Sequence, residues 1–132
     1  MDKPTIGLTM GDAAGIGPEI IVMALLEKRV RDICKPLVIG DTGIIRQALQ
    51  IINGRATVRK ITEIGEAHFK KDVMEIIDLD NLDSGLIERG KVNPLAGKAA
   101  FEYLQYAVSM ALKRDIGAVV TAPLNKEALN KS

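Results

Sequence analysis

A glycine-rich loop near the amino terminus has the composition of a ligand-binding turn. Residues 11–19 read Gly-Asp-Ala-Ala-Gly-Ile-Gly-Pro-Glu, between an apolar run and a segment with helical character. Glycine lets a backbone approach a ligand closely, and the free amides of a following helix attract anions or ligand oxygens. The candidate cofactor- or substrate-binding residues here are Gly11, Asp12, Gly15, Gly17 and Glu19. From the glycines alone, a tight strand-to-helix turn that binds nothing is the open alternative.

This loop is neither of two common nucleotide-binding motifs. Gly15-Ile-Gly17 lacks the third glycine of the dinucleotide fingerprint, and no Gly-Lys-Ser/Thr follows as in a P-loop. Residues 90–99 contain Gly97-Lys98, but the spacer from Gly90 is too long and the Ser/Thr is absent. We interpret that segment as the start of a helix, in which Gly97 permits close packing.

A second polar loop, Thr-Ala-Pro-Leu-Asn-Lys, follows another apolar run. Its candidate binding residues are Thr121, Asn125 and Lys126. Asn125 could hydrogen-bond a substrate, and Lys126 could fix a phosphate as a point charge. The alternative is that Asn125 caps a helix and Lys126 is solvated.

Short apolar runs alternate with longer helical patterns along the chain. The predicted strands are Thr5–Met10, Pro36–Gly40, Ala56–Ile61, Val73–Leu79 and Ala118–Ala122, the last one buried. The predicted helices are Glu19–Val30, Thr42–Ile52, Leu95–Lys113 and one that begins in Pro123–Asn130, with a long connection over 80–93. In the third helix, one broad apolar stripe joins two rows: Leu95, Ala99, Tyr103, Ala107 and Ala111, and Ala96, Ala100, Leu104, Val108 and Leu112.

Continuous rather than alternating apolar strands indicate an α/β fold with a parallel or mixed sheet and flanking helices. Ligands bind outside the carboxyl ends of parallel strands, where both candidate loops would then open on the same edge. Residues 1–132 suit one amino-terminal α/β domain. Because the last helix has barely begun at Ser132, we expect the fold to be incomplete in this chain.

The composition excludes several classes of function. Hydrophobic residues make up 47% of the 132 residues and the formal net charge is +1, which argues against a disordered tail, a nucleic-acid partner or attraction to a membrane surface. The single cysteine excludes an intrachain disulfide, and we expect a cytoplasmic protein without a membrane span or signal peptide. With one histidine, His68, interpreted as a surface residue, the chain has no transition-metal ligand cluster. Asp78, Asp80 and Asp83 lack the Gly and Glu of an EF-hand, so we interpret them as a polar loop.

Four ordered segments resemble the 4-hydroxythreonine-4-phosphate dehydrogenase family, related to the isocitrate and isopropylmalate dehydrogenases. They are Gly11–Glu19, Pro36–Asp41, Gly97–Ala100 and Val120–Ala128, and they cover essentially the whole chain. The form Thr-Ala-Pro-Leu-Asn-Lys-Glu-Ala is similar to the branch that handles D-threonate or D-erythronate 4-phosphate.

The resemblance implies an isocitrate/isopropylmalate dehydrogenase-like fold and the amino-terminal part of an NAD-dependent dehydrogenase of pyridoxine biosynthesis or the threonate branch. Such an enzyme oxidises and decarboxylates a small phosphorylated hydroxy acid. It also implies a homodimer and a divalent metal, such as zinc or magnesium, held by histidines.

Family members are more than twice this long, and their metal-binding histidines come after this chain ends. No catalytic residue and no metal ligand is therefore assigned here, and residues 1–132 alone are expected to be inactive. Two alternatives are a free-standing α/β module that binds a phosphorylated small molecule without catalysis, and a structural or interaction domain.

Overall fold

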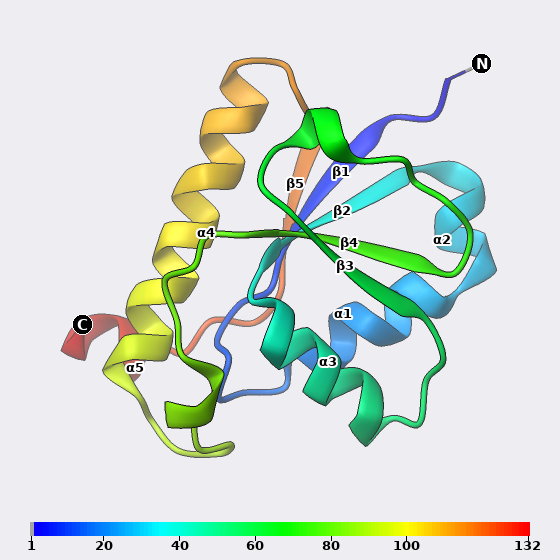
Figure 1. Ribbon diagram of the computed structural model, residues 1–132. Coiled ribbons are helices and arrows are strands. Elements are labelled where there is room, and N and C mark those ends of the chain that lie inside the picture. Colours follow the sequence, from blue (N-terminus) through cyan, green and yellow to red (C-terminus); the bar gives the residue numbers. More distant parts are fainter. Residues whose placement is uncertain (1) are drawn as a thin grey trace.

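The computed structural model describes residues 2–132 as a five-stranded, fully parallel sheet with helices on both faces (Figure 1). The strands are β1 (Thr5–Thr9), β2 (Lys35–Gly40), β3 (Thr57–Ile61), β4 (Val73–Asp78) and β5 (Ala118–Thr121), in the spatial order β3-β4-β2-β1-β5. The predicted α/β class is confirmed, and the sheet is parallel rather than mixed.

Helices α1 (Gly17–Leu26), α2 (Lys28–Ile33) and α3 (Thr42–Ile51) lie on one side of the sheet, and α4 (Pro94–Leu112) lies on the other (Figure 1). The short α5 (Lys126–Lys131) packs against the first turns of α4. Two single-turn 3₁₀ helices occupy Ile64–Glu66 and Ser84–Leu86. A Cβ on Gly97 would clash with the backbone of Ala128, so this glycine permits close packing as predicted, and α5 is the element that packs there.

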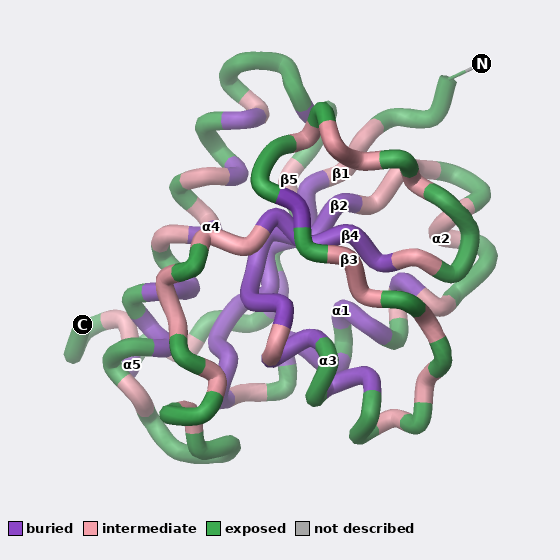
Figure 2. The backbone as a smooth tube through the Cα atoms, viewed as in Figure 1, coloured by how far each residue is buried: buried purple, intermediate pink, exposed green. Residues whose placement is uncertain are grey.

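The core lies between the sheet and the two helical layers (Figure 2). It is aliphatic, as the composition predicts, and β2 and β4 contribute its centre through Leu37, Ile39, Ile76 and Ile77, each at most 1% exposed. These two strands are flanked on both sides, which explains their continuous apolar runs. No helix within residues 2–132 is both long and apolar enough to cross a bilayer.

Two predicted helices differ from the structure. The helix predicted over 19–30 is two helices, because Glu27 has an extended backbone (φ −76°, ψ 119°) that separates α1 from α2. The helix predicted to start at Pro123 starts at Lys126, because Asn125 caps it by accepting a 3.0 Å hydrogen bond from the amide of Ala128.

The strand predicted to be buried, β5, is mostly exposed because it is an edge strand that pairs only with β1 among the described residues. The broad apolar stripe of α4 is also only half buried. Its inner positions Ala99, Tyr103 and Ala107 reach the core, whereas Val108 and Leu112 are exposed.

Candidate functional site at the carboxyl edge

The glycine-rich loop leaves β1 at its carboxyl end and leads into α1. Its shape comes from Asp12, whose Oδ1 accepts a 2.8 Å hydrogen bond from the amide of Ala14 and whose carbonyl accepts one from Gly15. Helix α1 begins with Gly17 and Pro18 and has no side-chain cap at Ile16. An uncapped start of a ten-residue helix leaves backbone amides of the first turn available to a ligand.

The structure brings the two predicted loops together. The amide of Asp12 donates to the carbonyl of Pro123 at 3.2 Å, and the amide of Ala122 donates to the carbonyl of Thr9 at 3.1 Å. In this sheet β1 is followed by a helix on one face, and β5 by α5 beside α4 on the other (Figure 1). Ligands of open α/β sheets bind at such a reversal, so both loops stand where a ligand is expected.

The three glycines of the glycine-rich loop differ in their structural roles. A Cβ on Gly11, whose φ is +75°, would lie 2.5 Å from the carbonyl oxygen of Pro123. A Cβ on Gly17 would lie 2.6 Å from the carbonyl oxygen of Met10. These two glycines therefore permit the loops to pack against each other. A Cβ on Gly15 would meet nothing closer than 3.6 Å, which is ordinary contact, so the packing of the loops does not require a glycine at this position.

A third segment, the long connection before α4, also reaches the glycine-rich loop. Gly90 donates its amide to the carbonyl of Ala14 at 2.7 Å, and the Arg89 guanidinium forms an ion pair with Glu19. This bond raises the pKa of Arg89, which stays charged. The sequence does not predict a role for Arg89, because its partner Glu19 is 70 residues away and no neighbouring motif indicates the ion pair.

Three buried oxygens at this edge have no hydrogen-bond partner among residues 2–132: Thr9 Oγ1, Asp12 Oδ2 and Glu19 Oε2. Buried polar atoms are nearly always paired, so a cluster of unpaired ones calls for an explanation. Burial raises the pKa of Asp12, and the hydrogen bond from Ala14 offsets part of the rise. The loop thus holds spare acceptors, with one carboxyl that gains a proton more readily than usual.

The remaining predicted residues lie on the second loop. Thr121 and Lys126 are exposed, and Lys126 has no carboxylate within ion-pair distance in residues 2–132. Asn125 uses its side-chain oxygen as the cap of α5, which is the alternative that the sequence left open. His68 is exposed at the other end of β4, away from both loops. No three His, Cys, Asp or Glu side chains within 2–132 are placed to hold a metal ion.

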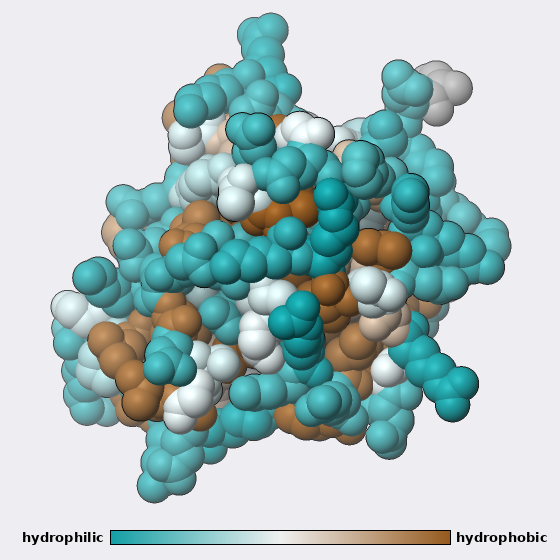
Figure 3. All heavy atoms as spheres, viewed as in Figure 1, coloured by the Kyte–Doolittle hydropathy of each residue, from teal (hydrophilic) through white to brown (hydrophobic). Residues whose placement is uncertain are grey.

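Apolar side chains surround this edge. Ile16, Leu86, Leu95 and Leu124 are all exposed, and they belong to the glycine-rich loop, the long connection, the start of α4 and the second loop. Figure 3 shows apolar surface gathered where α5 and the start of α4 lie. Exposed apolar groups around a polar centre are typical of a surface that another part of a protein or a ligand covers.

The fold defines a parallel α/β protein in which the two candidate loops meet at the carboxyl edge of the sheet. The family described as "Pyridoxal phosphate biosynthetic protein PdxA" matches residues 32–132, and the chain belongs to this family. A Clostridium botulinum protein named "Putative D-threonate 4-phosphate dehydrogenase" is 42% identical over 130 residues, which are 98% of this chain and 39% of that protein. A protein of the same name from Halalkalibacterium halodurans is 42% identical over 96% of this chain and 38% of its own length.

Among solved structures, a 4-hydroxythreonine-4-phosphate dehydrogenase from Burkholderia phymatum superimposes with a TM-score of 0.96 at 40% identity. The match covers 99% of this chain and 39% of that one. The chain therefore spans about two fifths of the length of these relatives. The predicted family is confirmed, and these relatives are named as dehydrogenases.

Proposed function

We propose that this chain is the amino-terminal domain of an NAD-dependent dehydrogenase that oxidises and decarboxylates a small phosphorylated hydroxy acid. The substrate is 4-phosphohydroxy-L-threonine or D-threonate or D-erythronate 4-phosphate. The observation that carries the proposal is the hydrogen-bonded contact between residues 11–19 and 121–126 at the carboxyl edge, in a chain similar to named dehydrogenases of this type.

The residues present fit such ligands. Gly15 is a glycine that loop packing does not require, and the uncapped start of α1 offers amides to a phosphate or another oxygen. Lys126 is a cation without a protein partner among the described residues, suited to a phosphate.

The role of these residues is to bind and orient. Hydride removal also needs a group that takes the hydroxyl proton and one that stabilises the developing charge. A divalent metal supplies Lewis-acid polarisation of the oxygen when bound, and we place its histidine ligands outside residues 1–132. The exposed apolar residues at the edge support a cleft closed by the rest of the protein. We also propose that the whole enzyme is a cytoplasmic homodimer.

The test is NADH formation by the full-length protein with each of the three candidate acids, in the presence of magnesium or zinc. Turnover with D-threonate or D-erythronate 4-phosphate alone would assign the threonate branch, and turnover with 4-phosphohydroxy-L-threonine the vitamin branch. Binding of phosphorylated acids without turnover by any of them would favour a binding module instead.

A further inference from the structure

A large cavity lies at the edge of the sheet opposite the glycine-rich loop. It measures about 950 Å³ and opens among residues that precede or begin β1, β2 and β4, including Lys3, Lys35 and Val73. In Figure 1 this edge is the one beside α2 and the amino terminus. The five residues of β1 alone separate the two edges by roughly 16 Å. The proposed dehydrogenase chemistry assigns no role to this cavity.

The cavity walls are cationic although the chain is nearly neutral. Five lysines and arginines and one histidine line it against three acidic residues. Lys28 pairs with Asp32 at 2.8 Å, and Arg31 pairs with Asp72 at 3.7 Å. Glu75 is paired with Arg59 at 2.6 Å, which leaves three lysines of the lining against Asp2. Lys35 and Lys71 have no carboxylate within ion-pair distance among residues 2–132. The remaining positive charge therefore favours an anion.

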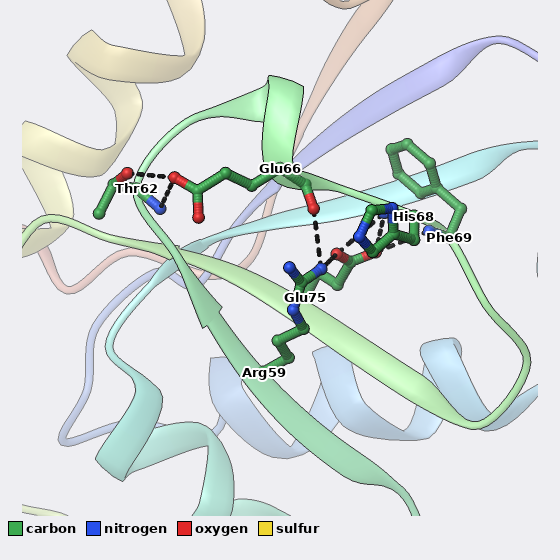
Figure 4. A network of polar contacts seen from close by, with 6 residues as sticks. All are labelled: Arg59, Thr62, Glu66, His68, Phe69 and Glu75. Atoms are coloured by element: carbon green, nitrogen blue, oxygen red, sulfur yellow. Dashed lines mark hydrogen bonds and ion pairs between the residues drawn. The ribbon is translucent and has the colours of Figure 1, made fainter.

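One wall is fixed by a buried carboxylate. The side chain of Glu75, 1% exposed, accepts hydrogen bonds from the amides of His68 at 2.9 Å and Phe69 at 2.7 Å (Figure 4). Arg59 bonds the same carboxylate and also donates to the carbonyl of Glu66 at 2.8 Å. This network ties residues 66–69 to β3 and β4, so the wall is held in place before any ligand binds.

The same network holds an unfavourable backbone conformation. Phe69 has a backbone φ of +52°, in a region that residues other than Gly, Asn and Asp rarely adopt. Such strain costs roughly 1–3 kcal/mol and concentrates at binding sites. The Phe69 ring faces Lys35, whose Nζ lies 5.8 Å from the ring centroid. Phe69, Pro36 and Val73 give the cavity an apolar surface beside its cations.

We propose that this cavity binds an organic phosphate with at least two negative charges and a planar or apolar group. The phosphates would contact Lys3, Lys35 and Lys71, and the planar group would lie against Phe69. A volume of about 950 Å³ is within the usual range of small-ligand sites. The site is separate from the carboxyl edge, so its ligand and the dehydrogenase ligands can be bound together.

The test uses ADP with the full-length protein in isothermal titration calorimetry. Pyrophosphate and adenosine serve as the charged and planar halves of the probe. We expect ADP to bind more tightly than either half, and substitutions in the cavity separate this site from the proposed cofactor cleft. The double substitution Lys35→Gln/Lys71→Gln should lower the affinity for ADP at least about tenfold, since each lost contact involves a charged group. Lys71→Gln alone, at an exposed position, should weaken it with no change in melting temperature.

The matched control is Lys98→Gln/Lys113→Gln, which removes two exposed lysines outside the cavity. It should leave ADP affinity unchanged, and the cavity variants should keep the kcat and the KM for NAD of the native protein. The proposal is overturned if ADP does not bind the native protein, if Lys35→Gln/Lys71→Gln binds ADP as tightly as the native protein, or if the control loses as much affinity as the cavity variant.

Discussion

Substitution of two glycines of the same loop separates a packing role from a ligand-facing role. Gly17→Ala would place a methyl group 2.6 Å from the Met10 carbonyl oxygen and 3.1 Å from the Cβ of Ala122. The obstacle at Met10 is backbone, so it cannot move aside as the end of a flexible side chain could. Gly15→Ala would place its methyl group no closer than 3.6 Å to any neighbour, which is ordinary contact.

Overpacking of this kind typically costs about 1–3 kcal/mol. For a protein longer than this domain, each kcal/mol lowers the melting temperature by roughly 2–4 °C, so Gly17→Ala should lower it by about 2–12 °C. Gly15→Ala should change it by less than about 2 °C. The assay is thermal unfolding of the full-length protein followed by circular dichroism.

For the KM the expected order is the reverse, with the larger effect at Gly15. Gly15→Ala should raise the KM for NAD or for the phosphorylated acid, and Gly15→Val should raise it further, because Gly15 lies on the proposed binding loop at a position where packing does not require a glycine. Equal melting temperatures for native protein and Gly17→Ala would refute the packing argument. An unchanged KM in a folded Gly15→Val protein would show that the loop is only a turn.

Three further outcomes are expected. Lys126→Ala should weaken binding of the phosphorylated acid more than binding of NAD, since the exposed ammonium is proposed to contact the phosphate; equal effects in a titration with both ligands would mean that it is merely solvated. Asp12→Asn should stabilise the protein near neutral pH, measured by denaturant unfolding. The raised pKa of Asp12 means that the ionised form costs stability, and this cost appears as pH rises from its usual pKa through the raised one. A native-like pH dependence of the variant would contradict this. Residues 1–132 expressed alone should form no NADH above background with any candidate acid. Turnover would show that the catalytic groups lie within these residues.

The sequence predicts most of the fold because the strands are continuous apolar runs. The bounds of β2 and β4 agree with prediction within one residue, and both strands are central and flanked by helices. Exposure of β5 could not be predicted in this way, because an apolar run does not reveal whether a second neighbour is present. The break at Glu27 was also missed, since helical periodicity continues across it and only its extended backbone separates the helices.

The position of the candidate site could be predicted in part, because it follows from the order and direction of the strands. The two loops were placed at one edge from the rule that ligands bind at carboxyl strand ends, and their contact through Asp12 and Pro123 follows from the pairing of β1 with β5. The ion pair of Arg89 with Glu19 has no local signal. The packing task of Gly17 became visible only once Met10 and its carbonyl had positions in space.

The contacts at the carboxyl edge differ in how firmly they hold their segments. One backbone hydrogen bond, from the amide of Asp12 to the carbonyl of Pro123, joins residues 11–19 to residues 121–126 and continues the pairing of β1 with β5. The long connection joins the glycine-rich loop through the amide of Gly90 and the ion pair of Arg89 with Glu19. The Arg89 side chain is 41% exposed, but that of Glu19 is only 11% exposed. Loss of Arg89 would leave a largely buried carboxylate without its cation, which costs more than the loss of a surface pair. The pair with Arg89 therefore holds the long connection against the glycine-rich loop.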